Sequence, residues 1–69
     1  MKISARNTLK GRISAIKRGA VMAQITVDIG GGKTVSSAIF VDSVDDLALN
    51  VGDEVIAVIK STDVMIARP

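Results

Sequence analysis

A run of five apolar residues, Val55 to Ile59, constrains the fold of this chain more than any other stretch. Most of these residues are β-branched, which is typical of a β-strand buried on both faces. The run ends at Lys60, Ser61 and Thr62, which carry one ammonium and two hydroxyl groups. Because a buried strand is a rigid support, we expect these groups to be held in place, where they can donate hydrogen bonds to an anion.

The chain has 69 residues, and we expect one domain over residues 1–69. A domain of this size buries only about 60% of the surface that its unfolded chain exposes, so a separate monomer is marginally stable. The sequence contains no cysteine and no histidine, which excludes disulfides and metal sites built on thiolate or imidazole ligands. Since 48% of the residues are apolar, we expect a homo-oligomer.

Charge and hydropathy argue against two kinds of partner. Nine lysines and arginines against seven acidic residues give a net charge of +2, too small for a field that attracts nucleic acid. No apolar stretch approaches the ~20 residues that span a bilayer, and only Met1 and Lys2 precede the first polar cluster. We therefore expect a cytoplasmic protein with neither a membrane nor a nucleic acid as partner.

Alternation of apolar and polar residues predicts three β-strands in the first part of the chain. Leu9–Ala15 alternates with a period of two, and Gly11 within it indicates a bend or a close approach of another backbone. A second strand is predicted over Val21–Ile29 and a third over Thr34–Val41. The glycine run at 30–32 joins them. Because a strand rather than a helix follows this run, it predicts a hairpin and not a phosphate-binding loop.

The stretch Ser43–Asn50 is the one candidate helix. Ser43 and Asp46 have the spacing of a capping box, which favours a helix beginning at Ser43. Helical spacing predicts three side chains that close the core, namely Val44, Leu47 and Ala48.

A last short strand is expected at Val64–Ala67. The predicted fold is therefore all-β, with five strands and one short helix between the third and the fourth. This is the element order of an OB-like Greek-key barrel. The third and fourth strands are apolar on both faces, whereas a small barrel needs only its inner face to be apolar. We expect the surplus to form an interface between copies of the chain.

Few residues suit catalysis or the binding of nucleic acid. The chain lacks histidine, cysteine and tyrosine, and its carboxylates fall mostly at turns and at a helix start, so we do not expect an enzyme. Phe40 is the one aromatic residue, and its apolar neighbours indicate a core or interface position. An OB-type module that binds single-stranded nucleic acid relies on aromatic platforms, so this function is disfavoured.

Two clusters of donors favour the binding of a small oxyanion. Ser4 and Arg6 share a face of an extended chain, and Lys60–Thr62 follow the buried strand. Taken alone, each cluster is more simply explained as a solvated start of a strand or as an ordinary turn. Brought together by the barrel or by an oligomer, they suit a fully deprotonated tetrahedral dianion. Hydrogen phosphate carries a proton that needs an acceptor, so such a site discriminates against it.

The same residues carry a resemblance to a known family. The segments ISARN at 3–7 and KSTDVMI at 60–66 closely resemble the molbindins, the small molybdenum-pterin-binding proteins called Mop, and the resemblance covers the whole chain. It implies an OB-like fold and a homohexamer built as a trimer of dimers. It also implies molybdate or tungstate held at subunit interfaces, for storage and homeostasis in the cytoplasm. A carrier of the molybdenum-pterin cofactor, molybdopterin, is the alternative.

The resemblance further implies which residues form the site. It assigns Ser4, Arg6, Lys60 and Ser61 as oxyanion ligands, with Ala5, Asn7 and Thr62 as backbone donors or orienting groups. Family members also hold anions on symmetry axes, and the turn that contains Gly19 and Ala20 is a candidate for such a place by its donors alone. No metal is expected to be ligated directly by side chains.

Overall fold

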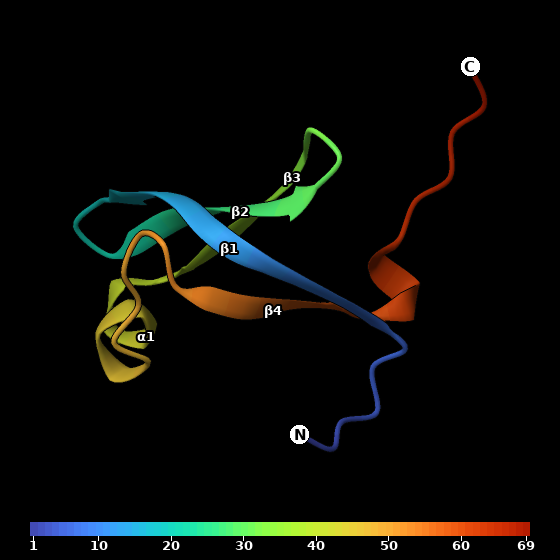
Figure 1. The fold of residues 1–69 in the computed structure, drawn as a ribbon. Coiled ribbons are helices and arrows are strands. Elements are labelled where there is room, and N and C mark those ends of the chain that lie inside the picture. Colours follow the sequence, from blue (N-terminus) through green and yellow to red (C-terminus); the bar gives the residue numbers. More distant parts are fainter.

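The computed structural model describes residues 1–69 and consists of one twisted antiparallel sheet with a short helix (Figure 1). The helix α1 lies between the third and fourth strands, and a single 3₁₀ turn, η1, follows the last strand. The elements are β1 (Asn7–Arg18), β2 (Met22–Gly30), β3 (Lys33–Phe40), α1 (Val41–Asp46), β4 (Glu54–Ile59) and η1 (Ser61–Asp63).

Strand β1 has a different partner along each half of its length. Residues 7–12 pair antiparallel with β4, and residues 12–18 pair antiparallel with β2. The sheet order is therefore β3-β2-β1-β4. The sequence predicts a shorter strand, Leu9–Ala15, because the alternating pattern covers only these residues. The residues at both ends of β1 are strand residues because their backbones pair with β4 and β2. The second strand is predicted to within one residue at each end.

Gly11 allows β1 and β2 to approach closely. A Cβ atom at this position would lie 2.4 Å from the carbonyl oxygen of Asp28 and 2.7 Å from Cγ1 of Val27, both in β2. Any side chain here would therefore push the two strands apart. The close backbone approach predicted from Gly11 is confirmed.

The glycine run at 30–32 forms the hairpin between β2 and β3. Gly31 and Gly32 have φ angles of 64° and 74°, in the left-handed region that glycine adopts without strain. The N–H of Gly30 donates to Oδ1 of Asp28 at 2.8 Å, and Gly30 pairs with Lys33 across the turn. The predicted hairpin is confirmed.

The core of the separate chain is small. Its five buried side chains come from β1, β2 and α1: Ile13, Ala23, Ile25, Val27 and Val44. Three of them occupy alternate positions of β2, because successive side chains of a strand point to opposite faces. Phe40 is 60% exposed, so a core position for it is wrong, and an interface position stays a prediction.

The predicted fifth strand does not form within the chain. Val64–Ala67 has no strand structure, and the sheet has four strands rather than five. The barrel is therefore open on one side, between β3 and β4. The prediction failed because alternating residues become a strand only beside another strand's free hydrogen-bonding groups, and this segment has none next to it.

The helix begins and ends earlier than predicted. It covers Val41–Asp46 instead of Ser43–Asn50, because β3 runs directly into it, and Phe40 occupies the N-cap position without a side-chain hydrogen bond. Ser43 lies inside the helix and caps nothing. Val44 is buried as expected, but the turn after the helix leaves Leu47 66% exposed and gives Ala48 a φ of 51°.

Burial of β4 on both faces is also wrong for the separate chain. Val55, Ala57 and Ile59 are half-buried, whereas Ile56 and Val58 are each 42% exposed. The outward face of β4 is thus apolar and uncovered. In β3, Val35 and Ile39 are half-buried and the other six residues are exposed, so this strand is not buried on both faces either.

Candidate anion-binding site

The structure brings the two predicted donor clusters to the same end of the molecule. The N-terminal cluster leads into β1 and the C-terminal cluster follows β4, and the pairing of Asn7 with Ile59 places these strand ends side by side (Figure 1). The side-chain amide of Asn7 donates to the carbonyl oxygen of Ile59 at 3.4 Å and to Oγ of Ser61 at 3.5 Å. Asn7 is thus the residue that links the two clusters.

The C-terminal cluster is shaped by η1. The N–H of Asp63 donates to the carbonyl oxygen of Lys60 at 2.9 Å, and the N–H of Val64 donates to that of Ser61 at 3.4 Å. These bonds close one tight turn directly after the rigid strand β4. The chain changes direction here, which leaves Lys60, Ser61 and Thr62 at the surface.

The cations of the site have no carboxylate partner. The one ion pair of the structure joins Arg18 and Asp45 at 3.0 Å, and both Arg6 and Lys60 lie outside it. Ser4 and Arg6 are exposed, Ala5 and Asn7 are half-buried, and the nearest carboxylate in sequence is that of Asp63. Two unpaired positive charges and several hydroxyl groups at one end form a donor set for an anion.

The site is open on the side away from the sheet. Its donors come from the segment before β1 and from the turn η1 after β4. Gly19 and Ala20 lie at the opposite end of β1, whose 12 residues rise about 3.3 Å each. Within one chain, the structure therefore separates this predicted turn from Arg6 and Ser61.

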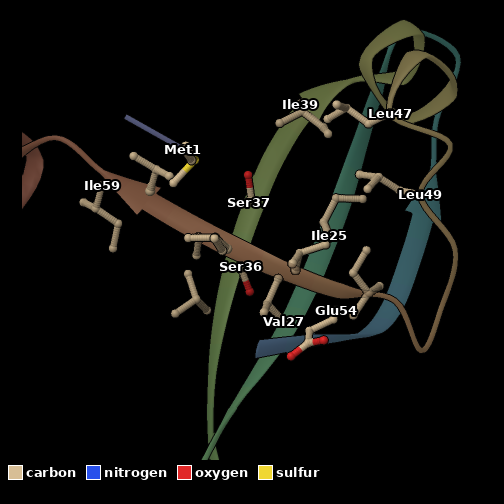
Figure 2. Close-up of a pocket in the computed structure, with 16 residues that line it drawn as sticks. Met1, Ile25, Val27, Ser36, Ser37, Ile39, Leu47, Leu49, Glu54 and Ile59 are labelled. Atoms are coloured by element: carbon tan, nitrogen blue, oxygen red, sulfur yellow. The ribbon is translucent and has the colours of Figure 1, made fainter. Parts of the chain in front are cut away.

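The largest apolar feature is a hollow that sequence reasoning missed. It has a volume of about 660 Å³ and lies between the free edges of β3 and β4 (Figure 2). Thirteen of its 16 lining residues are hydrophobic, and its polar members are Ser36, Ser37 and Glu54. One sequence signal could have located this hollow, namely the apolar faces predicted for the third and fourth strands.

Two further features bear on the class of protein. The structure has no cluster of three or more histidine, cysteine, aspartate or glutamate side chains that could hold a metal ion. None of its helices has the length and apolar character needed to cross a bilayer. Fold and site together define a small, all-β, barrel-like protein with one short helix and a surface donor cluster.

Comparison with known proteins assigns the family. The family model described as TOBE domain matches residues 3–66. Molybdenum-pterin-binding protein 3 of Clostridium pasteurianum is 54% identical over 66 residues, which cover 96% of this chain and 97% of that protein. The chain belongs to the TOBE-domain family, among the molybdenum-pterin-binding (Mop) proteins.

Two solved structures have the same fold. MopII from Clostridium pasteurianum has a TM-score of 0.92 and 48% identity, with 97% of this chain and 100% of that chain covered. The cytoplasmic molybdate-binding protein ModG, solved with molybdate bound, has a TM-score of 0.83 and 46% identity, with 88% of this chain and 43% of that chain covered.

Proposed function

We propose that this protein binds molybdate or tungstate for storage and homeostasis, at the interfaces between copies of itself, and without catalysing a reaction. The observation that carries the proposal is the convergence of unpaired donors at the ends of β1 and β4, held together by the contact of Asn7 with Ser61. A molybdenum oxyanion as ligand is supported by the names of the relatives.

The chemistry of the donors fits a tetrahedral dianion. Arg6 and Lys60 supply two positive charges, which match the two negative charges of molybdate or tungstate. Ser4, Ser61 and Thr62 add hydroxyl groups, and Ala5 adds a backbone N–H. Since these side chains are mainly donors, the site favours an anion whose four oxygens all accept hydrogen bonds. Hydrogen phosphate would leave its own proton without a partner unless it reached Asp63.

A second copy of the chain is needed to complete the site. In the separate chain the donors Ser4, Arg6, Lys60, Ser61 and Thr62 are all exposed, so one chain does not enclose an anion. The turn with Gly19 and Ala20 lies at the opposite end of β1, and we propose it as a separate anion site on a symmetry axis of the oligomer. We propose a homohexamer, a trimer of dimers, of single-domain chains spanning residues 1–69 in the cytoplasm. The uncovered apolar face of β4 supports this self-association.

Titration calorimetry with molybdate, tungstate, sulfate and phosphate tests the proposal. We expect Arg6→Ala to weaken molybdate binding roughly 10- to 100-fold, because a hydrogen bond to a charged group contributes about 1.5–3 kcal/mol. Lys33→Ala, which removes an exposed cation at the hairpin tip, should leave the affinity unchanged. Unchanged binding by Arg6→Ala would contradict the site, and equal affinity for sulfate would contradict its selectivity.

A second candidate function is to carry the molybdenum-pterin cofactor. The hollow between β3 and β4 favours it, because the hollow is apolar, large enough for a small ring system, and carries the carboxylate of Glu54 at its rim (Figure 2). The name of the Clostridium relatives agrees with this function. Protein purified from native cells should then contain a fluorescent pterin, whereas the oxyanion proposal expects molybdenum or tungsten without pterin.

A further inference from the structure

The hydrogen bonds of Asn7 fix the way its side-chain amide faces. The backbone carbonyl oxygen of Ile59 can only accept a hydrogen bond, so the atom of Asn7 that lies 3.4 Å from it is the NH₂ nitrogen. The same nitrogen lies 3.5 Å from Oγ of Ser61 and has a second proton for it. The pairing of Asn7 with Ile59 in the sheet holds this arrangement in place. The hydroxyl of Ser61 therefore accepts a hydrogen bond from Asn7.

This hydrogen bond affects how Ser61 can act on a ligand. A serine hydroxyl has one proton to donate and two lone pairs that accept. Asn7 occupies one lone pair, and accepting this bond polarises the hydroxyl into a stronger donor. Ser61 itself donates to no side chain or backbone group of the chain, and it is exposed at the start of η1. Its proton is thus free for a ligand.

Hydroxyl groups are the part of the donor set whose polarity can vary. The guanidinium of Arg6 and the ammonium of Lys60 only donate, whatever anion binds. A free hydroxyl can instead turn a lone pair toward a protonated oxygen of the ligand. Ser61 is the one hydroxyl of the two clusters that the structure holds by a hydrogen bond. Its bond to Asn7 therefore removes an acceptor that hydrogen phosphate would otherwise use.

We propose that Asn7 sets the selectivity of the oxyanion site by keeping Ser61 a hydrogen-bond donor. The inference rests on the proposed function, because it concerns the same site. It predicts a preference among dianions of equal charge. Molybdate has no proton and accepts the proton of Ser61 on any of its oxygens, whereas the O–H of hydrogen phosphate lacks an acceptor. Asn7 is a positioning residue, since it acts through Ser61.

Competition among three oxyanions tests this role. Molybdate, sulfate and hydrogen phosphate are all dianions in mildly alkaline buffer, so a ratio of two affinities cancels a change in the charge of the site. Asn7→Asp exchanges the amide donor for a carboxylate, to which the hydroxyl of Ser61 would donate. Calorimetric competition should show the molybdate-to-phosphate affinity ratio falling about tenfold and the molybdate-to-sulfate ratio changing by less than about twofold. An equal loss of affinity for all three anions would overturn the proposal.

A double-mutant cycle gives a second test that holds where Asn7→Asp disturbs the strand end. Asn7→Ala should lower the molybdate-to-phosphate ratio about threefold in the wild-type chain, but not in a chain carrying Ser61→Ala, which lacks the hydroxyl through which Asn7 acts. Equal effects in the two chains would contradict the proposal. Asn50→Asp is the matched control. Its amide donates to the carbonyl oxygen of Ala48 at 3.1 Å, before the opposite end of β4, so both ratios should stay unchanged.

Failure of this inference is distinguishable from failure of the proposed function. A wild-type chain that binds none of the three anions would refute the function and, with it, the inference. A chain that binds molybdate, but loses affinity for all three anions equally in Asn7→Asp, would refute only the role of Asn7. Asp63, the nearest carboxylate in sequence, is retained in every variant, so any phosphate proton that it accepts contributes equally to each ratio.

Discussion

The side-chain amide of Asn7 donates a hydrogen bond to Oγ of Ser61 at 3.5 Å, joining residues that are 54 positions apart in the chain. The same amide donates to the carbonyl oxygen of Ile59. Asn7 therefore fixes the end of β4 and the first residue of η1 relative to the start of β1. In the proposed site, it positions Ser61 for the anion.

Asn7→Ala should weaken molybdate binding about threefold to tenfold and have little effect on folding. The bonds of Asn7 are long and partly exposed, so their loss should lower the free energy of unfolding by less than about 1 kcal/mol. Calorimetric titration and urea unfolding measure the two effects. Asn50→Ala, which removes a similar amide bonded to the carbonyl of Ala48, is the control and should leave binding unchanged. Wild-type affinity in Asn7→Ala would contradict a positioning role.

Gly11→Ala should destabilise the fold by about 1–3 kcal/mol, because overpacking forces backbone shifts. The added methyl group would lie 2.4 Å from the carbonyl oxygen of Asp28, which is backbone and cannot rotate away. Gly31→Asn is the matched control, since nothing lies within 4 Å of its Cβ position and asparagine tolerates its φ of 64°. Thermal unfolding at a fixed protein concentration compares the two variants, and equal melting temperatures would contradict the close approach of β1 and β2 at Gly11.

Val44→Ala should lower the free energy of unfolding by about 2 kcal/mol, from the lost burial of methyl groups and the cavity left behind. Val44 is 2% exposed and attaches α1 to the sheet, whereas Leu47, one turn later, is 66% exposed. Leu47→Ala should change the stability of the separate chain by no more than about 0.5 kcal/mol. Urea unfolding of the two variants at one fixed protein concentration checks the contrast. A larger loss for Leu47→Ala would show that Leu47 packs against the core, as the sequence predicts.

Arg18→Ala should change stability by less than about 1 kcal/mol despite removing the one ion pair. The guanidinium of Arg18 and the carboxylate of Asp45 are both exposed, with side-chain exposures of 49% and 61%, so solvent screens their attraction. Chemical unfolding at low and high salt measures the effect, which should shrink further as salt rises. A loss above about 2 kcal/mol would mean that the pair is buried in the assembled protein.

Local backbone chemistry made much of the fold predictable from sequence. The glycine run at 30–32 predicts the hairpin because few other residues adopt its φ angles. Gly11 predicts a bend or a close backbone approach because a glycine within a strand has no side chain to hold a neighbour away, and the structure shows the close approach. The alternation of β2 gives its bounds and its buried face. The meeting of the two donor clusters followed from the expected barrel and from the resemblance to the Mop proteins.

The errors concern what a segment packs against. The expected strand at Val64–Ala67 and the expected burial of β4 on both faces each require a neighbour that one chain lacks. Sequence patterning reports that a surface is apolar but not which molecule covers it. The helix start at Val41 was missed for a different reason, since the helix continues β3 without a capping side chain, and the capping residues at 43 and 46 point to a later start.

The small interior described above has a consequence for the amount of protein that a cell must hold. Five buried side chains leave the isolated polypeptide close to the limit of stability, so in the proposed oligomer folding and association become one equilibrium. Lowering the protein concentration then favours dissociated chains and so increases the unfolded fraction. A cell that makes few copies would keep a smaller fraction of them native, and under the proposed function its capacity for oxyanions would fall more steeply than the number of chains.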